Sequence, residues 1–185
     1  MARVGVLAVQ GAFARHAEAV RALGHACVLV TSPADMQGLE GLILPGGEST
    51  VQLQLIARLG LEPALRAFVC EGLPLLATCA GLILAARTVS DPSQPSFAFI
   101  DAAVRRNGYG RQLDSFEARD DADELPLIFI RAPRITALGA GVEVLARHRG
   151  EPVLLRERNV TCASFHPELS GDLRVHAAVF GAATV

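Results

Sequence analysis

The sequence predicts an α/β fold with a mostly parallel central sheet, helices on both faces of that sheet and a small antiparallel or mixed extension. Strand-like apolar runs alternate with helical periodicity through the first ninety residues, which is the pattern of parallel strands joined by crossover helices. Several short strand-like runs then follow one another without long helices between them. Hydrophobic residues make up 51% of the chain and aromatic residues only 5%, as in closely packed α/β layers. At 185 residues, we expect one domain over residues 1–185.

The first half is expected to alternate between strands and helices. Each expected strand is a short apolar run that ends at a turn, and each expected helix repeats its apolar residues at a spacing of three or four. Gly24 is suited to end the first helix. The expected strands are Arg3–Val9, Ala26–Val30, Gly41–Leu44 and 75–78. The expected helices are 13–23, Val51–Leu59, Glu62–Glu71 and one that begins after Cys79.

The second half is expected to consist mainly of strands. An exposed loop over 90–95 precedes them, an acidic loop over 120–124 faces solvent, and residues 148–151 form a hairpin turn. The expected strands are Phe97–Arg105, Ser115–Ala118, Leu127–Ile130, Val142–Ala146, Val153–Arg156 and Thr161–Phe165, followed by a helix over Leu173–Phe180.

Charge and composition exclude several classes of function. The net charge is −2 and the pI is near 6.2, so the chain lacks the electrostatic footprint of a nucleic-acid-binding protein. No apolar run reaches membrane-spanning length, and the first residues predict a strand rather than a signal peptide, so we expect a cytoplasmic protein. The four cysteines show no metal-ligand spacing. All seventeen basic residues are arginine, so the chain cannot form a lysine Schiff base.

Cys79 stands at the junction of two apolar runs. Residues 75–78 predict a buried strand and the pair Ala80-Gly81 opens a helix, so the thiol lies at a sharp corner. This corner is similar to a nucleophile elbow in which Gly81 is kept and Ala77 replaces the earlier glycine. The helix N-terminus favours a thiolate. Taken alone, the motif is also compatible with an inert buried cysteine.

His166 and Glu168 supply the two further groups that a thiol nucleophile requires, a base and a carboxylate that orients it. His166 ends an apolar run, as Cys79 does, and Pro167 stiffens the backbone between the imidazole and the carboxylate. Alone, this His-Pro-Glu segment could also be an ordinary loop. The remaining histidines are expected at the surface: His16, His25, His148 and His176.

The turn over residues 45–50, PGGEST, follows another predicted strand. Its paired glycines let backbone N–H groups approach a ligand. Ligands bind beyond the carboxyl ends of parallel strands, so this turn belongs to the same edge of the sheet as Cys79 and His166. The N–H groups of Gly47 and Ala80 can then form an oxyanion hole. A phosphate-binding loop is the competing interpretation, although the lysine of such loops is missing.

These motifs resemble those of a known enzyme family. PGGEST, TCAGL and SFHPE are similar to the motifs of class I glutamine amidotransferases, which hydrolyse the side-chain amide of glutamine with a Cys-His-Glu triad. Longer stretches, GVLAVQGAFARH, LILPGGEST, RRNGYGRQLDSFEA and FIRAP, resemble the glutaminase subunits of pyridoxal 5′-phosphate synthases. The resemblance spans about residues 4 to 176 and implies the three-layer fold of that family.

The resemblance also implies a role for each matching residue. Cys79 would be the nucleophile, His166 the general base and acid, and Glu168 the orienting carboxylate. The residues implied in glutamine binding are Gly46, Gly47, Glu48, Ser49, Arg106, Ile130 and Arg131, with Gly47 and Ala80 as the oxyanion hole. An arginine can clamp the substrate α-carboxylate, although Arg106 and Arg131 could instead form surface ion pairs. Gln10 and Gly11 are the expected contacts with a partner that orders the oxyanion hole.

The implied partner is a (β/α)-barrel synthase subunit that receives the ammonia, in a large assembly of glutaminase–synthase heterodimers. The resemblance implies no cofactor or metal in this chain, and no nucleic-acid or membrane partner. Two other interpretations keep the same motifs: a glutaminase of another amidotransferase or a γ-glutamyl hydrolase, and a catalytically silent regulatory or assembly subunit. The intact Cys79, His166 and Glu168 argue against the silent subunit.

Overall fold

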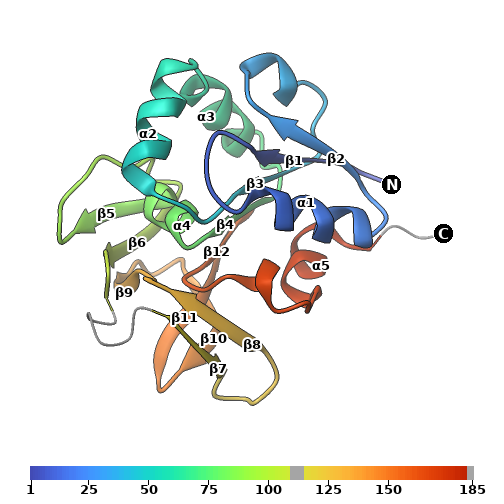
Figure 1. The fold of residues 1–185 in the computed structure, drawn as a ribbon. Coiled ribbons are helices and arrows are strands. Elements are labelled where there is room, and N and C mark those ends of the chain that lie inside the picture. The colour runs from blue at the N-terminus through green and yellow to red at the C-terminus, as the bar shows by residue number, and fades with distance from the viewer. Residues whose placement is uncertain (109–114, 183–185) are drawn as a thin grey trace.

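The computed structural model describes residues 1–108 and 115–182, and a seven-stranded sheet forms its centre (Figure 1). In spatial order the strands are β10 (Glu143–His148), β11 (Glu151–Glu157), β12 (Val160–Ala163), β4 (Leu75–Thr78), β3 (Gly41–Leu44), β1 (Arg3–Leu7) and β2 (Ala26–Val30). The strands from β12 to β2 are parallel, and β11 runs antiparallel to both of its neighbours. The predicted mostly parallel sheet is therefore confirmed.

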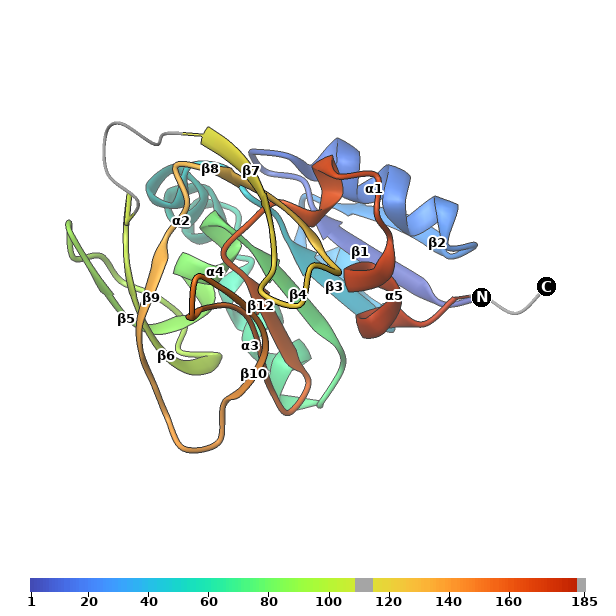
Figure 2. The same cartoon turned by 90° about the horizontal axis from the view of Figure 1, so that it is seen from below.

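Helices cover both faces of this sheet, which confirms the predicted three layers (Figures 1 and 2). On one face lie α1 (Phe13–Ala22) and α5 (Arg174–Phe180), and on the other lie α2 (Ser49–Arg58), α3 (Glu62–Cys70) and α4 (Ala80–Ala85). Two short 3₁₀ helices, η1 (Pro33–Met36) and η2 (Pro167–Leu169), follow β2 and β12. None of the helices in the described ranges is long and apolar enough to cross a bilayer.

Two small sheets form the predicted extension. One contains β5 (Ala86–Ser90), β6 (Ile100–Arg105) and β9 (Arg134–Leu138), with β5 and β6 parallel and β9 antiparallel to β6. The other is the antiparallel pair β7 (Ser115–Arg119) and β8 (Pro126–Ile130). Residues of the first sheet belong to the hydrophobic cluster of α2, α3 and α4, whereas those of β8 belong to the cluster of α1 and α5.

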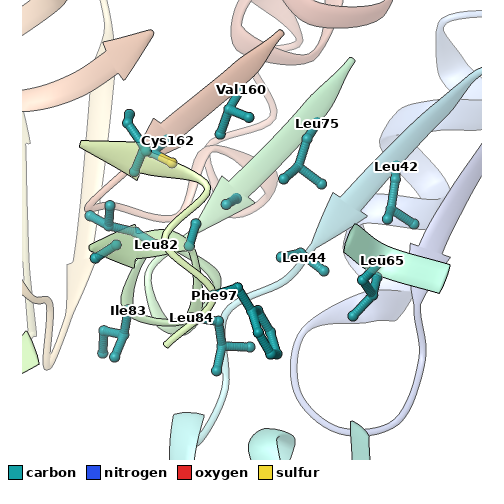
Figure 3. Packing of buried hydrophobic residues seen from close by; sticks show 14 of the residues in the cluster. Leu42, Leu44, Leu65, Leu75, Leu82, Ile83, Leu84, Phe97, Val160 and Cys162 are labelled. Atoms are coloured by element: carbon teal, nitrogen blue, oxygen red, sulfur yellow. The ribbon is translucent and has the colours of Figure 1, made fainter. Parts of the chain in front are cut away.

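Alternate residues of β3 and β4 pack on opposite faces of the central sheet. Leu42, Leu44 and Leu75 enter the cluster beneath α2, α3 and α4 (Figure 3). Ile43 and Leu76 enter the cluster beneath α1 and α5. All five side chains are fully buried. Burial on both faces explains why these strands are continuous apolar runs in the sequence. It also holds the strands in place, and with them the positions of the turns that follow.

Strands β5 and β9 were not predicted, and β6 begins later than expected. The sequences ARTVS and RITAL of β5 and β9 have neither a continuous apolar run nor a regular alternation, and their burial patterns are irregular. The predicted strand Phe97–Arg105 begins only at Ile100, because Ala98 has a φ of 56° that interrupts the extended backbone. Both differences lie outside the central sheet.

His25 was predicted in a solvated loop, but its side chain is buried and joins the two ends of the described chain. The Ala2 N–H donates to its Nδ1 at 3.2 Å, and its Nε2–H donates to the Gly181 carbonyl at 2.8 Å. These two contacts assign the ring as the neutral Nε2–H tautomer, since Nδ1 has to accept.

Replacing His25 with leucine is expected to lower the free energy of unfolding by about 1–2 kcal/mol, because two partly buried hydrogen bonds of the imidazole are lost. Urea unfolding monitored by circular dichroism measures this loss. His25→Gln keeps a donor for Gly181 and should lose less than the leucine variant. Equal losses in the two variants would show that the hydrogen bond to Gly181 contributes nothing.

Candidate active site

The turns after four parallel strands meet at one edge of the sheet, as the sequence predicted. They are Gln10 after β1, residues 46–49 after β3, Cys79 after β4 and His166 after β12. A cavity of about 290 Å³ lies among them. Its lining consists of Gln10, Gly47, Glu48, Ser49, Cys79, Ile83, Arg106, Asn107, Ile130, Arg131 and His166. Gly46 and Ala80 lie directly beside lining residues in the chain, and most of the predicted site residues therefore share one cavity.

Cys79 occupies a strained corner between β4 and α4. Its φ of 49° and ψ of −103° are unusual for a residue with a side chain. The Cys79 N–H donates to the Ala163 carbonyl at 2.9 Å, which ties the corner to β12. A Cβ at Gly81 would lie 2.1 Å from the Leu44 carbonyl oxygen, so only glycine allows α4 to begin this close to β3. The corner thus has the strand–turn–helix geometry of a nucleophile elbow.

The Cys79 thiol is nearly buried and faces the cavity. It is 5% exposed, and its Sγ lies 3.7 Å from the Ile130 carbonyl oxygen, to which the thiol donates. Gly46 separates the thiol from the imidazole: a Cβ at that position would lie 2.3 Å from His166 Cε1 and 3.3 Å from Cys79 Cβ. The first glycine of the turn therefore makes room for both side chains.

His166 and Glu168 form a close buried pair. The distance between His166 Nδ1 and Glu168 Oε1 is 2.7 Å, and both side chains are almost inaccessible to solvent. The His166 backbone is held by its N–H, which donates to the Ile128 carbonyl at 2.8 Å. Pro167 begins η2, so the turn that follows β12 folds the carboxylate back onto the ring.

This pairing favours a protonated His166. Burial alone would lower the pKa of the imidazole, but hydrogen bonds and charge from Cys79 and Glu168 outweigh the burial and raise it to about 10. Burial alone would raise the pKa of Glu168, but the hydrogen bond from His166 and the two neighbouring imidazoles lower it overall. The carboxylate is thus ionised and stabilises an imidazolium beside the thiol.

His16 and His176 were predicted at the surface, and this prediction was wrong. Both rings are fully buried, because α1 and α5 pack together on the same face of the sheet. His16 Nδ1 lies 2.9 Å from His176 Nε2, and His16 Nε2 lies 3.3 Å from Glu168 Oε2. The helical periodicity placed both residues on helices but did not show which face is covered.

The glycine turn is held by two glutamines. The Glu48 N–H donates to Gln10 Oε1 at 2.8 Å. Gln52, which is fully buried in α2, donates from Nε2 to the carbonyls of Gln10 at 3.1 Å and Pro45 at 3.2 Å. Sequence reasoning missed Gln52, although its spacing from the buried Ile56 marks it as part of the buried face of α2.

Gly11 lies against the same turn. Its φ is 102°, and a Cβ there would lie 1.9 Å from the Gly46 carbonyl oxygen, so the backbone of the turn after β1 touches the backbone of the turn after β3. The position of Gln10 and Gly11 is therefore coupled directly to the position of Gly46 and Gly47.

Charged and polar groups of the cavity are paired with one another. Arg106 Nη2 lies 2.9 Å from Glu48 Oε1, and Arg106 Nη1 donates to Thr50 Oγ1 at 3.3 Å. The buried Ser49 hydroxyl donates to Gln94 Oε1 at 2.9 Å, a contact from the loop 90–95 that the sequence did not predict.

The predicted substrate-binding residue Arg131 is exposed and has a φ of 44°, directly after the end of β8. In the motif over 105–118, residues 109–114 lie outside the described part of the chain.

The fold and this edge of the sheet define a class I glutamine amidotransferase. A solved structure described as a glutamine amidotransferase superposes with a TM-score of 0.89 at 44% identity, covering 95% of this chain and 96% of that one. PurLQS from Thermotoga maritima has the same fold, with a TM-score of 0.66 at 16% identity, covering 97% of this chain and 98% of that one.

Sequence comparison narrows this class to one family. Residues 6–182 match the SNO glutamine amidotransferase family. The pyridoxal 5′-phosphate synthase subunit PdxT of Desulfitobacterium hafniense (strain Y51) is 49% identical over 178 residues, which is 94% of this chain and 89% of that relative. The chain therefore belongs to the SNO glutamine amidotransferase family.

Proposed function

We propose that this glutamine amidotransferase hydrolyses L-glutamine with a triad of Cys79, His166 and Glu168. The observation that carries the proposal is the 2.7 Å contact of the buried Glu168 carboxylate with His166, beside the strained Cys79 thiol. The Cys79 thiolate attacks the δ-amide carbon, and His166 protonates the amide nitrogen, so that the C–N bond breaks and ammonia leaves. His166 then takes a proton from water, which attacks the thioester and releases L-glutamate.

The substrate is bound by the turns around the triad. In this proposal the N–H groups of Gly47 and Ala80 stabilise the oxyanion. The Arg106–Glu48 ion pair presents one charge of each sign to the cavity, which suits the α-carboxylate and α-ammonium of an amino acid. The remaining contacts with glutamine are assigned to Gly46, Gly47, Ser49, Ile130 and Arg131.

The chain acts as the glutaminase subunit of a pyridoxal 5′-phosphate synthase, as the names of its PdxT relatives support. Free ammonia is mostly ammonium at neutral pH, so it has to pass directly to the subunit that uses it. We assign that role to a (β/α)-barrel synthase subunit in a large cytoplasmic assembly. Residues 1–185 then act as one glutaminase domain, with Gln10 and Gly11 as contacts that order the oxyanion hole. Because the chain has no lysine, imine chemistry falls to the partner.

Glutamine turnover with and without the synthase subunit tests this function. We expect glutamate release to rise strongly when the synthase is added, and pyridoxal 5′-phosphate to form with glutamine as the only nitrogen source. Release of glutamate without pyridoxal 5′-phosphate would indicate another amidotransferase. Hydrolysis of γ-glutamyl peptides by the isolated chain would indicate a γ-glutamyl hydrolase, and no turnover in any arm would indicate a silent subunit.

A further inference from the structure

A line of buried imidazoles continues behind the triad carboxylate. Glu168 Oε1 faces His166, while Glu168 Oε2 lies 3.3 Å from His16 Nε2, and His16 Nδ1 lies 2.9 Å from His176 Nε2. The side chains of His16 and Glu168 are completely shielded from solvent. Glutamine hydrolysis as described above uses neither His16 nor His176.

The line also reaches the glycine turn. Thr78 Oγ1 lies 3.1 Å from His16 Nε2 and accepts a hydrogen bond from the Gly46 N–H, also at 3.1 Å. Thr78 is the last residue of β4 and is fully buried. His16 therefore touches, through one nitrogen, both the carboxylate that orients His166 and the hydroxyl that holds Gly46.

Hydrogen bonding distinguishes between the two neutral tautomers of His16. Among the described residues, Glu168 Oε2 and His176 Nδ1 have no hydrogen bond of regular geometry. If His16 carried its proton on Nδ1, its Nε2 lone pair would face the carboxylate, and His176 would bury an unpaired Nδ1–H. If both rings carry the proton on Nε2, His176 donates to His16, and His16 donates towards Glu168 and Thr78. This arrangement buries no unpaired N–H in either ring and directs an N–H, in place of a lone pair, towards Glu168 Oε2.

We propose that His16 is a positioning residue whose Nε2–H, shared between Thr78 Oγ1 at 3.1 Å and the free oxygen of the Glu168 carboxylate at 3.3 Å, stabilises that carboxylate, and that His176 fixes the tautomer in which His16 can do so. This inference rests on the proposed function of the triad. The donor holds Glu168 ionised and oriented, and through Thr78 it couples the carboxylate to the turn that carries the proposed oxyanion hole.

The charges of the surrounding groups agree with this arrangement. Burial lowers the pKa of both His16 and His176 to about 4, so each ring is neutral at neutral pH. Among the described residues, the side chains in contact with Glu168 and the two rings are His166 after β12, Thr78 on β4, His16 on α1 and His176 on α5. The charged residues Arg15 and Glu18 of α1 line a cavity beside Glu168 and form an ion pair with each other. In the row of contacts His166–Glu168–His16–His176, Glu168 is therefore the carboxylate, and His166 is the imidazole with a raised pKa.

The tautomer can be measured directly in the wild-type protein. In ¹⁵N-labelled protein at pH 7, long-range ¹H–¹⁵N correlation spectra distinguish Nε2–H from Nδ1–H rings, and His16→Asn and His176→Asn assign the signals. We expect the Nε2–H pattern for both rings. An Nδ1–H pattern for His16 would overturn the proposal, whether or not the protein hydrolyses glutamine.

Two variants of His16 test the positioning role in the complex with the synthase. His16→Gln keeps an amide donor near the position of Nε2, whereas His16→Asn keeps a polar group only near Nδ1. We expect His16→Asn to lower kcat roughly 10- to 100-fold with little change in KM, the scale of one hydrogen bond to a buried charge. We expect His16→Gln to stay within about 3-fold of the wild-type kcat.

The pH profile separates positioning from packing. Loss of the donor raises the pKa of Glu168, which has to be ionised to orient His166, so the pH below which kcat/KM falls should increase in His16→Asn and not in His16→Gln. Urea unfolding of both variants reports any loss of fold. Equal losses of kcat in both variants, with an unchanged pH profile, would show that His16 only packs. A wild-type complex without turnover would instead count against the proposed function, and the tautomer measurement would still decide the inference.

Discussion

Replacing Cys79 with alanine is expected to lower glutamine hydrolysis in the complex with the synthase subunit by about 10⁴-fold or more, because Cys79 carries the only thiol among the described residues that line the cavity. Glutamate release measures the loss. Synthesis of pyridoxal 5′-phosphate from added ammonium salt should continue, since the synthase then receives its nitrogen without the glutaminase.

The matched control is Cys70→Ala, because Cys70 is an exposed thiol at the end of α3. We expect this variant to hydrolyse glutamine at the wild-type rate. Glutamine hydrolysis that survives in Cys79→Ala would contradict the nucleophile assignment. Loss of ammonium-supported synthesis in the same variant would point instead to a damaged interface with the synthase.

Replacing Glu168 with glutamine is expected to lower kcat by roughly 10³- to 10⁴-fold, the scale seen when an orienting carboxylate is neutralised in an unrelated triad. The carboxamide has nearly the same shape but carries no charge, and its NH₂ group can donate to His166 Nδ1 and impose the wrong tautomer. Steady-state assays with the synthase at saturating glutamine measure the effect.

The pH profile of the Glu168→Gln variant should also change, in a direction that follows from the charges. In the free wild-type enzyme Cys79 and Glu168 raise the pKa of His166 to about 10, so the ring keeps its proton beside the thiolate up to about that pH, and kcat/KM falls above it. Without the carboxylate charge the pKa of His166 decreases, so the fall begins at a lower pH. The control is the substitution Glu71→Gln, at an exposed residue that directly follows α3. An unchanged upper limit would show that Glu168 does not stabilise the imidazolium.

The central sheet and the residues that line the cavity at its edge could be predicted because their signals are local. Continuous apolar runs mark strands buried on both faces, and Cys79 and His166 each follow such a run directly. Parallel strands end at the same edge, so the sequence order alone brings these turns together. Gly46 and Gly47 follow the predicted strand 41–44, so the sequence also placed their turn at this edge of the sheet.

The missed features depend on packing between distant segments. His16 and His176 are 160 residues apart, and only the contact between α1 and α5 buries them. Gln94 could not be connected with Ser49, because the loop 90–95 has no pattern that fixes its path. Strands β5 and β9 are covered by neighbours in the extension, and their mixed composition reflects partial exposure of each strand.

The hydrogen bonds of His25 bring the ends of the described chain to opposite sides of one imidazole. Ala2 precedes β1, whereas Gln10 follows it, so a strand of five residues, about 16 Å long, separates this junction from the cavity. A fluorophore or affinity tag attached near either end would therefore sit at the amino-terminal edge of the sheet (Figure 2). Docking of a partner over the cavity could then be followed with a labelled protein whose binding surface is left unmodified.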